Sequence, residues 1–191
     1  MKPGQDLVVG GCIGLEGTVY AAEREKERLG RMLPQDLLRT ALGFRKELER
    51  RPEGAVRAEE GRVFVEAVEK GGILAALWDM AERYQAGLAV YLRRIPIRQE
   101  TVEICEALDL NPYELLSGGC ALFAADNGND VLFQLEEAGI CGAVIGKVTG
   151  GRDRLILNGE VRSYLNRPAP DEIEKLKKKT EEVRPWIRIP R

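Results

Sequence analysis

Histidine is absent from the 191 residues of this chain. Imidazole is the side chain that most often exchanges protons near neutral pH, and it is a common ligand of zinc. Its absence excludes Ser-His-Asp triads, Cys-His dyads and histidine-ligated metal sites within this chain. Acid–base chemistry that depends on imidazole is excluded with them.

The cysteines are few and widely spaced. Cys12, Cys105, Cys120 and Cys141 contain no Cys-x-x-Cys pair, so their spacing indicates neither a zinc knuckle nor a redox dithiol. Each lies among apolar neighbours. We therefore interpret all four as buried free thiols, with a reactive thiol as the less favoured alternative.

Long apolar runs and a strong net charge are also missing. No run approaches the roughly 20 apolar residues of a membrane-spanning helix, and residues 1–4 do not begin a signal peptide. The net charge of −2 gives no electrostatic reason to expect nucleic acid or an anionic membrane as a partner. The chain is long enough for one well-buried domain with a short appendage. We expect a cytoplasmic protein.

Apolar runs of strand length alternate with segments of helical periodicity. The expected strands cover residues 7–9, 63–65, 88–92, 121–124, 143–148, 155–157 and 161–165. The expected helices cover residues 18–32, 73–84, 99–108, 129–138 and 171–183, with another from Pro34 to the turn at 50–54. Asn158-Gly159 is a strong hairpin signal, which argues against an all-parallel sheet. We predict the α/β (α+β) class, with a layered mixed β-sheet flanked by helices.

A pair of prolines divides the chain near its C-terminal end. We expect residues 1–167 to form one domain and residues 168–191 to form a charged helix and a tail. The lysines of this helix lie among glutamates, which is typical of a surface helix with i, i+4 ion pairs. Trp186 lies in the tail beside Ile187 and Ile189, and we expect it to bury against its own domain or a second subunit.

Three glycine-rich turns precede predicted helices or strands. Backbone amides and a helix N-terminus at such a turn form a cradle for an anion, and Thr18 is the expected cap of the first helix. The alternative is sharp turning with close backbone packing, because neither a Walker loop nor a dinucleotide fingerprint is present. The candidate phosphate- or ligand-binding residues are Gly14, Gly17, Thr18, Gly71, Gly72, Ser117, Gly118 and Gly119.

No residue in these turns is predicted to be catalytic. Ser117 has no base within its motif, so a polar binding role is the most that we assign to it. Glu100 and Glu103 are one helical turn apart and could bind magnesium, but a solvated helix face is the favoured interpretation. We predict no metal ligand.

Four segments, in this order, carry a family resemblance: residues 2–9 with 13–18, residues 69–77, residues 95–105, and residues 110–125 with 142–148. They resemble the C-terminal half of the aminoimidazole ribonucleotide (AIR) synthetase superfamily, which includes selenophosphate synthetase, and especially its hydrogenase maturation factor branch. The resemblance implies an AIR synthase C-terminal-domain-like fold. It also implies that a separate N-terminal half, not found in this chain, supplies most of the groups that hold ATP and magnesium.

The departures from the family pattern concern the groups that would face the nucleotide. Active relatives carry an Asp-x-Thr or similar polar group before the glycine pair, where this chain reads Ala67-Val68-Glu69. Glu69 brings negative charge to the expected position of the triphosphate. Relatives that transfer a carbamoyl group end in a cysteine, whereas this chain ends in Pro190-Arg191. These differences argue against synthesis of a cyanide group by this chain.

Three functions follow from the resemblance. The favoured one is a stand-alone domain that is not catalytic by itself and acts as a ligand- or protein-binding module, without a cofactor. The alternative is the C-terminal half of a split ATP-dependent phosphoryl-transfer or dehydration enzyme, which binds ATP and Mg only when a separate N-terminal half completes it. The third is a fragment of a longer protein. A homodimer is expected in the first two cases.

Overall fold

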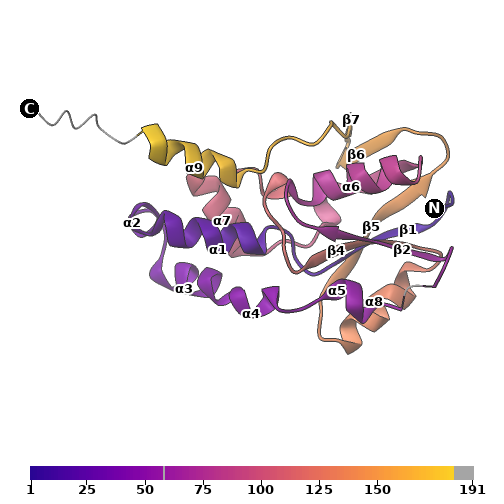
Figure 1. Cartoon of the computed structure of the whole chain (residues 1–191), viewed down its shortest axis with the longest axis horizontal. Helices are drawn as coiled ribbons and strands as arrows, with labels where there is room; N and C mark the ends of the chain where they lie inside the picture. The colour runs from indigo at the N-terminus through magenta and orange to yellow at the C-terminus, as the bar shows by residue number, and fades with distance from the viewer. Residues whose placement is uncertain (58, 183–191) are drawn as a thin grey trace, which may run out of the picture.

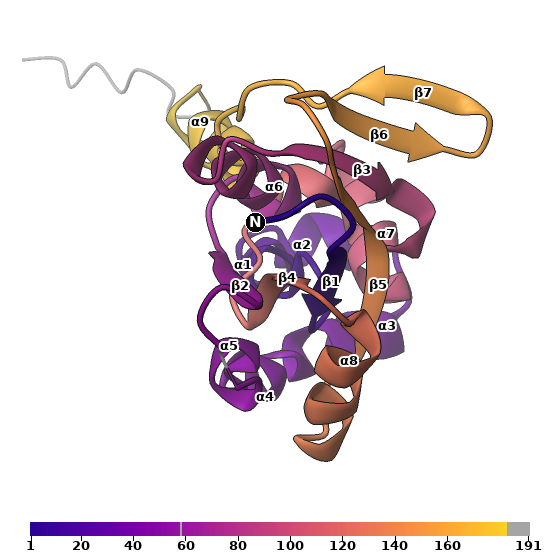
Figure 2. The ribbon, with the colours of Figure 1, turned by 90° about the vertical axis from the view of Figure 1, so that its right-hand side faces the viewer.

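The computed structural model describes residues 1–57 and 59–182. Its strands are β1 (Asp6–Gly10), β2 (Val63–Val68), β3 (Gly87–Tyr91), β4 (Cys120–Ala125), β5 (Gly142–Thr149), β6 (Arg154–Asn158) and β7 (Val161–Tyr164). They form one seven-stranded sheet in the order β2-β4-β1-β5-β3-β6-β7 (Figure 2). Neighbouring strands run antiparallel except β3 and β6, which are parallel. The mixed sheet confirms the predicted fold class, and the Asn158-Gly159 hairpin forms as expected.

Helices cover both faces of the sheet and continue beyond one of its ends (Figure 1). One face carries α6 (Gly72–Arg83), and the other carries α8 (Gly128–Glu137) with the short α5 (Pro52–Ala55). Two 3₁₀ turns, η1 (Leu92–Arg94) and η2 (Pro112–Glu114), lie between strands and helices. The helices beside the sheet are α1 (Leu15–Arg24), α2 (Lys26–Leu29), α3 (Gln35–Gly43), α4 (Arg45–Leu48), α7 (Gln99–Leu108) and α9 (Ile173–Glu182).

The central strand β1 is apolar on both faces because both faces are covered. Side chains alternate along a strand, so Leu7 and Val9 face the core beneath α6, whereas Val8 faces the core beneath α8. All three are fully buried. The neighbouring strand β4 follows the same rule, with Leu122 on the α6 side and Phe123 on the α8 side. The sheet therefore separates two hydrophobic cores.

A third core fills the helical cluster beside the sheet. Leu15 from α1, Phe44 between α3 and α4, and Ile104 from α7 are each at most 1% exposed. Ile173 and Leu176 of α9 are buried in the same core. The division into residues 1–167 and 168–191 stays a prediction, and the expected contact of Trp186 lies outside the described residues.

Two predicted helices are broken in the structure. The helix expected at 18–32 begins at Leu15, and Glu25 leaves the helical conformation, so that α2 turns and Leu29 is buried in the same core as α3. The helix expected from Pro34 divides at Gly43 and Phe44, because glycine is a poor helix former and Phe44 is drawn into the core. The turn at 50–54 contains the short helix α5.

Among residues 1–57 and 59–182, no helix is long and apolar enough to cross a membrane.

Asp6 ties β1 to its neighbours and makes the stability of the fold depend on pH. Its carboxylate accepts hydrogen bonds from the Lys147 ammonium (2.7 Å) and the Gly128 backbone N–H (3.0 Å). Partial burial pushes the pKa of Asp6 upward, but these two hydrogen bonds and the charge of Lys147 outweigh it, so the pKa lies below its ordinary value of 3.8. The stabilisation is therefore fully present above pH 3.8 and is lost as the pH falls through the lower folded-state value.

We expect Asp6→Asn to flatten the dependence of Tm on pH in the range of about 2 to 5. The measurement is a series of thermal melts followed by circular dichroism. The exposed Asp36, which pairs only with Arg39 on the surface, provides the control Asp36→Asn. Parallel curves for wild type and Asp6→Asn would contradict the assignment.

Candidate functional site

The three glycine-rich turns predicted from the sequence meet at one backbone segment. This segment, residues 115–119, joins η2 to β4. Gly17 N–H donates to the carbonyl of Leu116 (2.9 Å), and Ser117 N–H donates to the carbonyl of Glu69 (3.3 Å). Helices α1 and α6 both begin beside this segment, so residues about 50 and 100 positions apart are brought together.

Ser117 lies at the centre of this arrangement and is fully buried. Its Oγ accepts a hydrogen bond from the Gly14 N–H (2.7 Å) and donates one to the Leu115 carbonyl (2.7 Å). Both interactions hold the hydroxyl within the protein, and no base contacts it among the described residues. Ser117 is therefore placed to cap α1 and not to attack a substrate.

The sequence predicted that Thr18 caps α1, but Thr18 does not lie at the N-cap position. Gly14, in the left-handed conformation with φ +72°, takes the N-cap position, where a Cβ would lie 2.9 Å from Thr101 Cγ2. Thr18 lies inside the helix, where its Oγ1 donates to the Gly14 carbonyl (2.7 Å) and bonds the Thr101 hydroxyl (2.9 Å). Its hydroxyl is buried and faces α7.

The turn at Gly71 and Gly72 holds a carboxylate from the same chain. Both glycines have positive φ, and Gly71 is the N-cap of α6. The Asp171 carboxylate accepts hydrogen bonds from the N–H groups of Gly71 (2.7 Å), Leu116 (3.3 Å) and Ile173 (3.0 Å), and Asp171 is only 8% exposed. Such a concave turn at a helix N-terminus is a common site for a phosphate, and here Asp171 takes that place.

The third turn is arranged in the same way. The Glu16 carboxylate accepts a hydrogen bond from the Gly118 N–H (3.2 Å). A side chain at Gly118 would place its Cβ 2.2 Å from that carboxylate oxygen. Each of the three turns thus contains a backbone N–H that already donates a hydrogen bond to an oxygen of this chain. The acceptors are Ser117 Oγ, the Asp171 carboxylate and the Glu16 carboxylate.

Close packing accounts for the remaining glycines. A Cβ at Gly17 would lie 2.4 Å from Leu115 Cγ, and one at Gly72 would lie 2.5 Å from the Tyr113 carbonyl oxygen. At Gly119 the Cβ would approach Leu48 Cα to 3.1 Å. The structure therefore gives each glycine a packing reason, and ligand binding by these residues stays a prediction.

Asp171 and Glu16 were not among the residues predicted from the sequence. Asp171 carries a local signal, since an aspartate just before an amphipathic helix is a preferred N-cap, and its bond to Ile173 N–H is of that kind. Asp171 also accepts a hydrogen bond from the Gly71 N–H, 100 residues away, and no local sequence pattern predicts that contact.

Residues 67–69 precede the glycine pair, where the family resemblance implies groups that face the nucleotide. Ala67 and Glu69, at the positions where active relatives carry polar groups, are both exposed, and the Glu69 carbonyl is used by Ser117 and Gly72. In the described ranges, no group of three or more Cys, Asp or Glu residues is placed to hold a metal ion. The N–H groups that would cradle phosphates already have acceptors within the chain.

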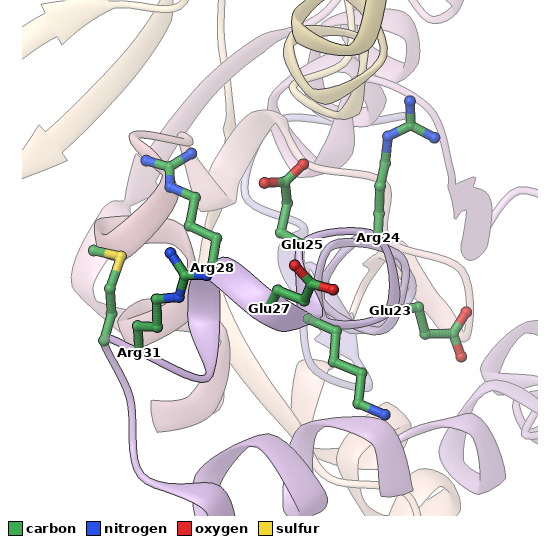
Figure 3. A pocket seen from close by; sticks show the side chains of 8 residues that line it. Glu23, Arg24, Glu25, Glu27, Arg28 and Arg31 are labelled. Atoms are coloured by element: carbon green, nitrogen blue, oxygen red, sulfur yellow. The ribbon is translucent and has the colours of Figure 1, made fainter. Parts of the chain in front are cut away.

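Two of the hollows in the surface bear on ligand binding. The first, of about 680 Å³, is lined by the α1–α2 junction, where the side chains of Glu25, Glu27, Arg24 and Arg28 spread in different directions (Figure 3). Acidic and basic side chains alternate along this lining, and Arg24 and Arg28 donate to the carbonyls of Leu176 (3.3 Å) and Ala107 (3.4 Å).

The second hollow, the cleft beside α6, has a volume of about 260 Å³. Among the residues that line it are Gly71, Tyr113, Tyr164 and Arg167. Burial raises the pKa of the Tyr113 phenol, which therefore stays protonated at neutral pH. Arg167 is exposed and forms no ion pair with another described residue. Glu114 also lines this cleft, but no ion pair joins it to Arg167, so the cleft offers a cation that no described carboxylate pairs.

Comparison with known proteins gives a family match and several relatives. The family model "AIR synthase related protein, C-terminal domain" matches residues 2–158. Carbamoyl dehydratase HypE of Rhodobacter capsulatus is 28% identical over 119 residues, which are 62% of this chain and 33% of that protein. A putative hydrogenase expression/formation protein of Methanocaldococcus jannaschii is 26% identical over 124 residues, 65% of this chain and 35% of that protein.

Solved structures agree with the fold. E. coli HypE, described as a hydrogenase maturation protein, superposes with a TM-score of 0.69 at 20% identity, covering 92% of this chain and 53% of that one. HypE in its complex with HypF gives a TM-score of 0.66 at 16% identity, covering 88% and 54%. The chain thus spans about half the length of these structures, and the matched segments cover about a third of the curated relatives.

Proposed function

Because the chain belongs to the AIR synthase related protein family, C-terminal domain, we propose that it serves as a binding module that is not catalytic by itself. This proposal rests on one observation: the N–H groups of the three glycine turns already donate hydrogen bonds to oxygens of Ser117, Asp171 and Glu16. An anionic ligand would have to displace two carboxylates to reach these N–H groups. We therefore assign no ATP-dependent step to this chain alone.

The cleft beside α6 is the binding site that we propose. The Arg167 guanidinium supplies a positive charge and the Tyr113 phenol a hydrogen-bond donor at its wall. Its volume of about 260 Å³ lies below the range of pockets for drug-sized ligands. A small anion, such as a short carboxylate or a phosphate, fits this volume and charge better than a nucleoside triphosphate.

Titration calorimetry of the purified chain with Mg·ATP tests the first part. We expect no saturable heat up to about 1 mM nucleotide, because the N–H groups that would bind the phosphates have internal acceptors. Binding of Mg·ATP in the micromolar range by the chain alone would contradict the proposal.

A thermal-shift series with citrate, inorganic phosphate and similar small anions tests the second part. We expect one class of anion to raise Tm, and Arg167→Ala to abolish the increase. Arg152, an exposed arginine on the β5–β6 turn, gives the matched control Arg152→Ala, which should keep it. An increase that survives in Arg167→Ala would place the anion elsewhere.

The second candidate function is the C-terminal half of a split ATP-dependent enzyme. It is favoured by the coverage of the solved relatives, since this chain matches only about half of each. A separate polypeptide would then supply the ATP-binding half. Affinity purification of the tagged chain from its native cells, followed by mass spectrometry, would reveal a stoichiometric partner of this kind, and Mg·ATP binding would appear only in the complex.

A homodimer and a cytoplasmic location remain part of the proposal. The edge strand β7 pairs with β6 on one side only and carries Val161 and Tyr164, each 66% exposed, and such apolar side chains beside an open strand edge favour contact with another chain. Light scattering coupled to size-exclusion chromatography distinguishes a monomer of 21.2 kDa from a dimer.

A further inference from the structure

Two cysteines that are 129 residues apart in the sequence face each other in the fold. Cys12 follows β1 and Cys141 precedes β5, and these strands are antiparallel neighbours with Gly10 opposite Gly142. The Gly11 N–H donates to the Cys141 carbonyl (2.7 Å), which extends the pairing by one step. The two Sγ atoms are 3.3 Å apart. The end of the sheet therefore holds the two thiols in contact.

The two thiols differ in their access to solvent. Cys12 is buried, with 6% of its surface exposed, whereas Cys141 is exposed. The interpretation of all four cysteines as buried thiols is therefore wrong for Cys141. Its apolar neighbours in the sequence concealed this, because the glycine turn after α8 brings Cys141 to the surface beside the end of β1.

Their electrostatic surroundings differ as well. The hydrogen bond from Cys12 lowers the pKa of Cys141 to about 6, and the nearby Arg98 acts in the same direction, against burial and the charge of Glu47. The same hydrogen bond, together with burial, raises the pKa of Cys12. The two shifts run in opposite directions, so Cys141 is the thiol that ionises first and Cys12 is the one that keeps its proton.

We propose that Cys12 and Cys141 form a redox-active dithiol whose substrate is a small disulfide, with Cys141 as the attacking thiolate and Cys12 as the resolving thiol. In the first step, Cys141 Sγ attacks one sulfur of the disulfide RSSR, forms a mixed disulfide and releases RS⁻. In the second step, Cys12 Sγ loses its proton to the released thiolate and attacks Cys141 Sγ, which expels a second RS⁻ that takes a proton from solvent. Overall, the thiolate–thiol pair gives up two electrons and one proton, solvent supplies the second proton, and RSSR becomes two RSH.

The geometry accommodates the product. A disulfide needs the sulfurs to approach to about 2.05 Å, so they must move together by about 1.2 Å, which rotation of the exposed Cys141 side chain can supply. Once Cys141 is in a mixed disulfide, its negative charge is gone. One cause of the raised pKa of Cys12 disappears with that charge, and Cys12 becomes easier to deprotonate in the resolving step.

The other two cysteines serve as internal controls. Cys105 and Cys120 are buried, and burial raises the pKa of Cys105 to about 12 and that of Cys120 as well. Neither has a second sulfur as its hydrogen-bond partner among the described residues. We expect both to stay reduced under conditions that oxidise the pair.

The test uses the reduced full-length chain incubated with oxidised glutathione, blocked with an alkylating reagent and digested for mass spectrometry. The expected product is a Cys12–Cys141 cross-linked peptide, with Cys105 and Cys120 alkylated. In Cys12→Ser, glutathione should remain on Cys141; in Cys141→Ser, no glutathione should be found on Cys12. Circular dichroism confirms that each variant is folded.

Iodoacetamide kinetics give a second readout that does not need the disulfide. We expect the alkylation rate of Cys141 to rise with an apparent pKa of about 6 in the wild type and at a higher pH in Cys12→Ala, which has no side-chain hydrogen-bond donor. A stable glutathione adduct on wild-type Cys141 without a cross-link would overturn the dithiol. So would an apparent pKa that does not change in Cys12→Ala.

Discussion

Asp171→Ala is expected to lower the free energy of unfolding by about 3 kcal/mol. The carboxylate accepts three backbone N–H groups, from Gly71, Leu116 and Ile173, and is nearly buried. Hydrogen bonds to a charged acceptor contribute more than neutral ones, and the three donors would lose their partner together. The substitution also separates the start of α9 from the start of α6.

Urea denaturation at neutral pH, followed by circular dichroism, measures this loss. Asp79 in α6 is exposed and accepts none of these backbone N–H groups, so Asp79→Ala is the control, with an expected change within about 0.5 kcal/mol. Asp171→Asn, which keeps an oxygen acceptor but not the charge, should fall between the two. Equal stability of Asp171→Ala and Asp79→Ala would show that Asp171 does not hold the turn.

Gly72→Ala is expected to cost about 3 to 4 kcal/mol, or to prevent folding. The residue has φ +63°, and its Cβ would lie 2.5 Å from the Tyr113 carbonyl oxygen and 2.9 Å from Leu115 N. Both obstacles are backbone atoms, which cannot move aside by rotating a side chain. The cost therefore combines a strained conformation with an overlap that only a shift of η2 relieves.

Gly139→Ala separates these two causes. Gly139 has a similar φ of +68°, but no atom of the described residues lies within 4 Å of the position that an alanine Cβ would take, so only the strained conformation contributes. We expect a loss of about 1 kcal/mol at this position. Denaturation curves for the two variants, measured side by side, give the contribution of close packing as their difference. Similar losses would mean that the segment after η2 adjusts easily.

Local sequence patterns predicted much of the fold. The apolar run at residues 7–9 indicated the central strand, Asn158-Gly159 indicated the hairpin, and Gly71 indicated the start of α6 within one residue. These features depend on neighbouring residues, so a short window of sequence contains their cause. The break at Glu25 was missed because it depends on burying Leu29 against a helix that comes later in the chain.

The glycine turns were predicted from the sequence, but their contacts were not. The glycine turns were found, since a positive φ and close packing leave glycine as the residue that fits. The side chains that accept hydrogen bonds from these turns were not predicted, because Asp171 and Gly71 are 100 residues apart in the sequence. The same holds for Cys12 and Cys141, whose contact depends on the pairing of β1 with β5.

The order of strands in the sheet has a consequence for how the chain is made. Of the described strands, β1 leaves the ribosome before the others and lies inside the sheet, and its neighbours β4 and β5 are synthesised more than 100 residues later. At typical elongation rates this delay is on the order of 10 s, during which an apolar strand has both edges open. Nascent chains that stop before Gly142 should therefore depend on chaperones or aggregate, whereas chains that extend past Thr149 can close the centre of the sheet.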